Sequence, residues 1–249
     1  MIAHVLENAA HSPARQIFVS THHPEFLDDL VDPAIELSGD RLRVVQAAEN
    51  LADSVLAVAD AAQFPLLITT ADNCLLTPAT IAEIETEAVR LGVDAGVALA
   101  RREDVLAVHP EGQRRFYEFS DVAVSNCNAY WIGDRRALRA AEAFRGGGQF
   151  VKKPVRVMQA FGLVNLLRFR FGLGPIHHVF RRISRHLKVD VAPLLVSNGA
   201  TAIDVDNERS LRVTEALMAR ADSVNPRPNC RGSRAEPGAA DGRLLAGTR

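Results

Sequence analysis

The sequence predicts an α/β protein, with helices on both faces of a mostly parallel, twisted sheet (a three-layer α/β/α fold). Two observations lead to this prediction. Short apolar runs alternate with segments of helical periodicity over residues 2–100. One of these runs, which begins at Leu66, is almost continuously apolar and β-branched and leads directly to Asp72. Alternating strands and helices are typical of parallel sheets with right-handed crossovers. A short, uninterrupted apolar run is typical of a strand that is covered on both faces.

Composition narrows the function classes. The chain has 249 residues, 47% of them apolar, and a net charge of −1. It is large enough for one large α/β domain, and its charge does not favour a nucleic-acid partner. The three cysteines, Cys74, Cys127 and Cys230, lack metal-ligand spacing and favour a reduced, cytoplasmic setting. No signal peptide and no transmembrane helix are expected, because no sufficiently long apolar run is present.

The first half of the chain reads as strand and helix in turn. Apolar spacing predicts three helices, at 2–11, after Asn50 and at 78–92. It predicts four strands, at 17–21, at 43–47, in the run that leads to Asp72, and at 94–100. Asn50 is a favourable N-cap for the second helix. Thr77 and Pro78 form a cap and first-turn pair for the third.

The pattern changes after residue 100. Extended segments at 116–120 and 122–132 predict an antiparallel addition to the sheet. The remaining elements are predicted as a helix at 134–145 ending at glycines 146–148, a helical insertion at 155–188 broken at 172–175, strands at 189–196 and 200–205, and a helix at 207–221. The folded domain is predicted to span 1–222. Residues 223–249 are rich in Pro, Gly, Arg and Ala, which indicates a disordered tail.

Two acidic segments suggest a metal site. Asp72 ends a strand, and Asp204 and Asp206 end the predicted strand at 200–205, where period-2 spacing would direct both side chains to one face. Carboxylates at the carboxyl edge of an α/β sheet are suited to Mg²⁺. The alternatives are that Asp72 is a loop or capping carboxylate, that Asp206 caps the last helix, and that Asp204 is solvated.

These residues carry a resemblance to a known family. Residues 67–78 resemble the strand–Asp–x–x–Leu–Leu–Thr–Pro signature of NTP transferases related to molybdenum-cofactor guanylyltransferase, in the GT-A-like nucleotidyltransferase superfamily. The segments 1–6, 50–56, 126–130 and 203–211 are similar to further segments of that superfamily, in the same order. Each motif is weak alone, and together they cover roughly residues 1–222.

The resemblance implies a fold, a reaction and a set of site residues. The fold would be that of a GT-A-like nucleotide-diphospho-sugar transferase. The enzyme would transfer an NMP group from an NTP to a phosphorylated or hydroxyl acceptor, releasing pyrophosphate with Mg²⁺ as cofactor. Asp72 and Asp206 would hold the ion, and Asp72 would be catalytic and contact the nucleotide. Asn50 and Ser54 would bind the nucleotide, and Asn128 would lie near the small-molecule acceptor.

The chain also departs from this family. Met1 aligns with the helix that follows the family's Gly-rich phosphate loop, so the loop and the first, normally central strand are expected to be missing. A misassigned start codon, a fragment and a degenerate, inactive homologue are the open explanations, and a truncated gene model is favoured. Lys153 and Lys152 could partly compensate, with Lys153 as a catalytic and Lys152 as an acceptor-binding residue. The alternative is a solvated lysine pair at a helix start.

Residues 156–188 interleave basic and apolar side chains. Such an amphipathic segment predicts peripheral contact with an anionic membrane, an insertion packed on the sheet, or a homodimer face. Two other functions remain open for the whole chain. One is a glycosyltransferase of the same fold, and the other is a non-catalytic protein that binds nucleotide or interacts with a partner.

Overall fold

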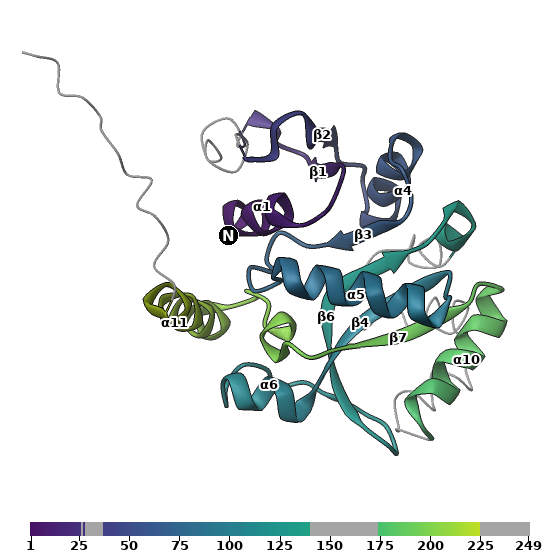
Figure 1. Ribbon diagram of the computed structural model, residues 1–249, viewed down its shortest axis with the longest axis vertical. Helices are drawn as coiled ribbons and strands as arrows, with labels where there is room; N and C mark the ends of the chain where they lie inside the picture. Colours follow the sequence, from purple (N-terminus) through teal and green to yellow (C-terminus); the bar gives the residue numbers. More distant parts are fainter. Residues whose placement is uncertain (26, 28–36, 140–173, 225–249) are drawn as a thin grey trace, which may run out of the picture.

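The computed structural model describes residues 1–25, 27, 37–139 and 174–224. Within them the predicted α/β fold is confirmed: a central sheet is flanked by helices on both faces (Figure 1). A second, two-stranded sheet lies beside it.

The main sheet has the strand order β3-β6-β4-β7. Its strands are β3 (Leu66–Thr69), β6 (Ala123–Ile132), β4 (Ala95–Arg101) and β7 (Val191–Val196), with the short β5 (Tyr117–Glu118) on β6. β4 and β7 are parallel, whereas β6 is antiparallel to both β3 and β4. The antiparallel strand is therefore central and the sheet is mixed. Local periodicity predicted the strand but carries no information on which neighbours it pairs with.

The smaller sheet pairs β1 (Ile17–Thr21) with β2 (Leu42–Gln46) in parallel. Helix α1 (Ile2–His11) packs Leu6 and Ala10 against Ile17 and Val19 of β1. Among the described residues β3 pairs with β6 alone, so one of its edges has no partner strand. Both faces of β3 are covered, as predicted, but its four side chains are only half-buried.

Alternating side chains of the main sheet build two cores. Ala98 and Ala100 of β4 face a cluster that contains Ile84 and Ala88 of α5 (Pro78–Leu91), and α5 crosses this face of the sheet in Figure 1. Leu99 faces the opposite cluster, which contains α10 (Ile176–Leu187) and the end of α4 (Leu51–Ala61). This arrangement is the three-layer α/β/α sandwich that the sequence predicts.

The predicted caps of α4 and α5 are confirmed. The Asn50 side chain accepts a hydrogen bond from the Asp53 amide at 3.0 Å, and the Thr77 side chain accepts one from the Thr80 amide at 3.2 Å. α5 ends at Gly92, whose φ of +64° is a conformation in which glycine is favoured. Helix α6 (Arg102–Val108) follows β4 directly and was not predicted.

The predicted strand at 200–205 is wrong. Residues Gly199–Ala202 form a 3₁₀ helix, η4, and the chain then runs extended without strand pairing to α11 (Glu208–Val224). The Asn198 side chain starts η4 by accepting a hydrogen bond from the Ala200 amide at 3.1 Å. The close packing of Gly199 on the α6 backbone then holds this short helix in place.

Several predictions fall outside the described residues. These are the helix beyond Arg139, glycines 146–148, Lys152 and Lys153, most of the 155–188 insertion, and the tail from 225. The structure starts the 134–145 segment as a 3₁₀ helix, η2 (Arg135–Ala137), after η1 (Gly39–Arg41) earlier in the chain. In α10, the apolar side chains of the amphipathic segment are buried against the sheet. None of the helices in the described part of the chain is both long and apolar enough to span a membrane.

Candidate functional site

Three aspartates from two distant segments meet at one end of the main sheet. Asp72 follows β3, and Asp204 and Asp206 lie between η4 and α11. One carboxylate oxygen from each lies within 4.8 Å of those of the other two. The Val205 amide donates a 3.2 Å hydrogen bond to the Asp72 carbonyl, which ties the two segments together. The structure thus brings together Asp72 and Asp206, and adds Asp204.

The loop that carries Asp72 is anchored to β6. Asn73 is fully buried, and its amide nitrogen donates to the Cys127 carbonyl at 2.7 Å and to the Thr69 hydroxyl at 3.2 Å. The Thr70 hydroxyl donates to the Asp72 carboxylate. These contacts fix the carboxylate at the carboxyl edge of β3, where α/β proteins bind ligands.

Asn128 orients Asp204 from the neighbouring strand. It lies in β6 beside the register shift that separates Val97 from Leu99 on β4, and its φ is +47°. Its amide nitrogen donates to the Asp204 carboxylate at 2.9 Å. Asn126 supports it by donating to the Asn128 side-chain oxygen at 2.9 Å and to the Tyr130 hydroxyl at 2.8 Å. The residue predicted to lie near the acceptor therefore also contacts the acidic cluster.

The charges of the cluster repel one another. Burial, followed by the nearby charges of Asp206 and Asp72, raises the pKa of Asp204, while the hydrogen bond from Asn128 opposes this shift. None of the three aspartates forms an ion pair with a basic side chain in the described part of the chain. Three oxygen donors without a neutralising cation form a donor set that suits Mg²⁺. The residues present fit the predicted ion.

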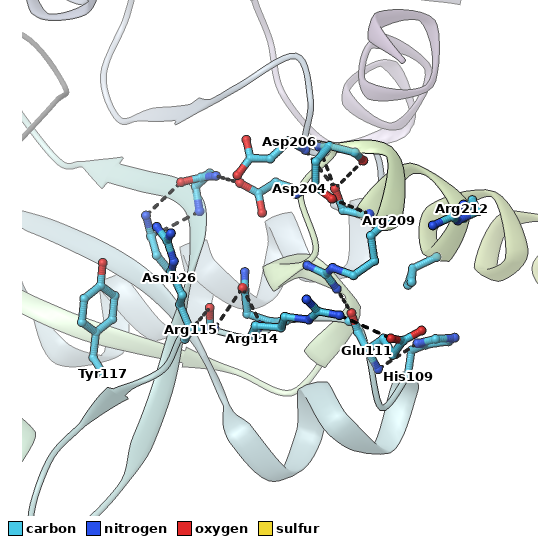
Figure 2. A pocket seen from close by; sticks show the side chains of 17 residues that line it. His109, Glu111, Arg114, Arg115, Tyr117, Asn126, Asp204, Asp206, Arg209 and Arg212 are labelled. Carbon is cyan, nitrogen blue, oxygen red and sulfur yellow. Dashed lines mark hydrogen bonds and ion pairs between the residues drawn. The ribbon is translucent and has the colours of Figure 1, made fainter. Parts of the chain in front are cut away.

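A cleft of about 910 Å³ opens beside Asp204 and Asp206. Figure 2 shows these two aspartates on one side and Arg114 and Arg115 on the other. Val213 is the only aliphatic side chain among the seventeen lining residues, and Arg209 and Arg212 also line the cleft. Asp72 is not among the lining residues. These arginines could not be identified from the sequence, because they lie in segments that have no recognisable spacing.

The predicted nucleotide-binding residues lie at the start of α4. Asn50 caps this helix, and its amide nitrogen contacts the Asp53 carboxylate at 2.6 Å. Ser54 is buried, and its hydroxyl donates to the Asn50 carbonyl at 3.0 Å and accepts from the Ala48 amide at 2.9 Å. Both side chains thus shape the β2–α4 turn, and their contact with a nucleotide stays a prediction.

Comparison with known proteins defines the fold. No family model and no curated protein matches the chain. Solved structures do match. A hypothetical transferase from Thermus thermophilus has a TM-score of 0.69 and 18% identity over 85% of each chain. CMP:2-keto-3-deoxy-manno-octonic acid synthetase complexed with CTP has a TM-score of 0.55 and 13% identity over 88% of each chain. The chain has the nucleotide-diphospho-sugar transferase fold.

A third solved structure supports the same assignment. 4-Diphosphocytidyl-2C-methyl-D-erythritol synthase from Anaerococcus prevotii DSM 20548 has a TM-score of 0.55 and 8% identity, and the match covers 87% of this chain and 85% of that one. At these identities the likeness shows the fold. Within this nucleotide-diphospho-sugar transferase fold, the three aspartates lie at the carboxyl edge of β3, next to an open cleft.

Proposed function

We propose that the protein is a Mg²⁺-dependent nucleotidyltransferase that transfers an NMP group from an NTP to a small-molecule acceptor. The observation that carries this proposal is the cluster of Asp72, Asp204 and Asp206, which lies at the edge of the cleft. Two structures of the same fold support it, because one is a CMP-sugar synthetase complexed with CTP and the other a diphosphocytidyl-methylerythritol synthase.

In this reaction an acceptor oxygen forms a bond to the α-phosphorus of the NTP. The bond between the α-phosphorus and the bridging oxygen breaks, and pyrophosphate leaves with its electron pair. Asp72, Asp204 and Asp206 would hold Mg²⁺, which when bound neutralises charge on the phosphates. Asn128 keeps the Asp204 carboxylate oriented through its 2.9 Å hydrogen bond. The fixed side chains contribute mainly by positioning the reactants.

The remaining site residues divide between the two substrates. Asn50 and Ser54 would contact the nucleotide, and Asn128, which lines the cleft, would lie on the acceptor side. Lys153 would act on the phosphates and Lys152 on the acceptor. These two lysines lie outside the described residues, so their roles rest on the family resemblance alone.

The proposal is tested by following pyrophosphate release by the full chain. With Mg²⁺, each ribonucleoside triphosphate and a panel of sugar phosphates and polyols, we expect release that is lost in Asp206→Asn and Asp204→Asn. Glu85→Gln, an exposed carboxylate on α5, is the matched control and should be fully active.

Two results would reject the proposal in favour of the other functions. Cleavage of nucleotide sugars without pyrophosphate release from NTPs would indicate a glycosyltransferase. Binding of Mg²⁺–NTP without turnover of any acceptor would favour a non-catalytic nucleotide-binding protein.

A further inference from the structure

The arginines of the cleft are not explained by the aspartate cluster. Four of the lining residues are arginines, Arg114, Arg115, Arg209 and Arg212, and they come from the loop after α6 and from the start of α11. A guanidinium cannot bind Mg²⁺. None of these four side chains can therefore be a ligand of the predicted ion.

Two of the four arginines already have carboxylate partners. Arg114 lies 3.6 Å from the Glu111 carboxylate, and Arg212 lies 3.0 Å from that of Glu208. Arg209 donates to the backbone carbonyl of Glu111, and no carboxylate of the described residues pairs with its charge. The Arg115 guanidinium likewise has no carboxylate partner within the described ranges. Two positive charges of the cleft are thus not neutralised.

The position of the cleft favours the acceptor over the nucleotide. Its walls come from β5, β6, the loop after α6 and the start of α11. Asn50 and Ser54, the predicted nucleotide contacts, follow β2 in the other sheet. Asp72 follows β3, which is the first strand after β2 in the chain, and it does not line the cleft. The three aspartates therefore lie between the cleft, on the acceptor side, and the predicted nucleotide contacts.

We propose that the acceptor carries a phosphate group and that Arg115 and Arg209 bind it in this cleft. This inference rests on the proposed function and specifies its acceptor. A phosphomonoester carries about −1.5 to −2 charges at neutral pH, which matches two unneutralised guanidinium groups. Guanidinium forks also donate paired hydrogen bonds to phosphate oxygens. A carboxylate would neutralise only one of the two charges, and a neutral polyol neither.

Calorimetric titration of the full chain tests the proposal. The probes are glycerol 3-phosphate and ribose 5-phosphate, their parents glycerol and ribose, and gluconate as a carboxylate. We expect the two phosphomonoesters to bind, the neutral parents not to bind in the same concentration range, and gluconate to bind more weakly. Arg115→Ala and Arg209→Ala should each weaken phosphomonoester binding at least about tenfold.

Two further variants serve as controls. Arg136→Ala removes an exposed arginine whose partner is Asp134 and that does not line the cleft, and it should bind phosphomonoesters as the wild type does. Arg209→Lys keeps the charge, so it should retain more affinity than Arg209→Ala if charge is what the site provides. Equal binding of a phosphate and its neutral parent, or unchanged affinity in both alanine variants, would overturn the proposal.

A parallel titration with Mg²⁺ and each ribonucleoside triphosphate separates this inference from the proposed function. Arg115→Ala should leave Mg²⁺–NTP affinity unchanged while weakening phosphomonoester binding. A loss of NTP affinity in Arg115→Ala would assign the cleft to the nucleotide and overturn the inference, although a nucleotidyltransferase would remain. Phosphomonoester binding that needs Arg115, in a chain that binds no NTP, would instead reject the proposed function and leave the anion site standing.

Discussion

Asn128 is one of two non-glycine residues with a positive φ in the described chain, the other being Lys188. Asparagine tolerates this left-handed conformation better than most residues. Here the conformation coincides with the register shift between β4 and β6 and with the 2.9 Å hydrogen bond to Asp204. The backbone irregularity therefore directs a strand side chain to the acidic cluster.

Two substitutions separate the backbone role of Asn128 from its side-chain role. Asn128→Ala should lower the free energy of unfolding by about 1 kcal/mol more than Asn128→Gly, because alanine is strained in the left-handed conformation and glycine is not. Both remove the amide, so both should weaken Mn²⁺ binding, used as a probe for Mg²⁺, by about tenfold. Urea unfolding and calorimetry measure the two effects. An Asn128→Gly protein with wild-type metal affinity would contradict this role.

Some site residues could be predicted from the sequence and others could not. The Asp72 strand end and the Asp204-Val205-Asp206 segment were recognisable, because family motifs and local charge mark them. The period-2 argument for Asp204 and Asp206 was wrong, since that segment is not a strand; the Val205 contact with the Asp72 carbonyl brings the carboxylates together instead. Arg115 could not be predicted, because its location depends on non-local folding.

At the scale of elements, η4 positions the segment that carries Asp204 and Asp206. It packs on α6 at Gly199, where a Cβ would lie 2.3 Å from the carbonyl carbon and oxygen of Asp104. No side chain fits at that separation, so α6 and η4 approach as closely as their backbones allow. The segment that follows η4 carries Asp204 and Asp206 to the carboxyl edge of β3.

Gly199→Ala tests this packing. We expect a loss of about 2 kcal/mol or more in the free energy of unfolding, because the clash is with backbone and cannot be relieved by a rotamer change. We also expect weaker Mn²⁺ binding, since η4 must shift. Gly92→Ala is the control, because its Cβ would meet open space and only its φ of +64° is unfavourable. It should lose about 1 kcal/mol and keep its metal affinity. Equal effects of the two substitutions on metal binding would rule out η4 as the positioning element.

At the scale of the molecule, stability should be concentrated in the main sheet. β4 and β6 lie in its centre and contribute to both core clusters, whereas β3 pairs with β6 alone in the described chain. The β1–β2 pair has its own small cluster with α1. Local opening of a structure follows such differences in buried contacts and strand pairing.

Hydrogen exchange of the intact protein should follow this order. We expect the amides of β4 and β6 to exchange slowest, those of β3 faster because one of its edges has no partner strand in the described residues, and those of β1 and β2 independently of the main sheet. Mass spectrometry of peptic fragments measures these rates. Uniform protection across β1, β3 and β4 would show that the two sheets open as one unit.

Some features of the two sheets follow from local sequence patterns and others do not. Local patterns, which neighbouring residues determine, predict the caps at Asn50 and Thr77, the seven strands and helices up to residue 101, and the three-layer fold. The central place of β6 and the separate β1–β2 sheet depend on pairings between distant segments, which periodicity does not encode. The cleft depends on the same pairings, because its walls come from three separate stretches of the chain, within residues 109–117, 125–128 and 204–213.

The proposed site depends above all on divalent-ion binding by the aspartate cluster. Titration of the full chain with Mn²⁺, followed by electron paramagnetic resonance with and without a ribonucleoside triphosphate, counts the bound ions. We predict one ion per chain held by Asp72, Asp204 and Asp206, with affinity reduced at least about tenfold in Asp204→Asn and Asp206→Asn and unchanged in Glu85→Gln. A wild-type chain that binds no ion even with nucleotide, or variants that bind it equally well, would contradict a metal site at these aspartates.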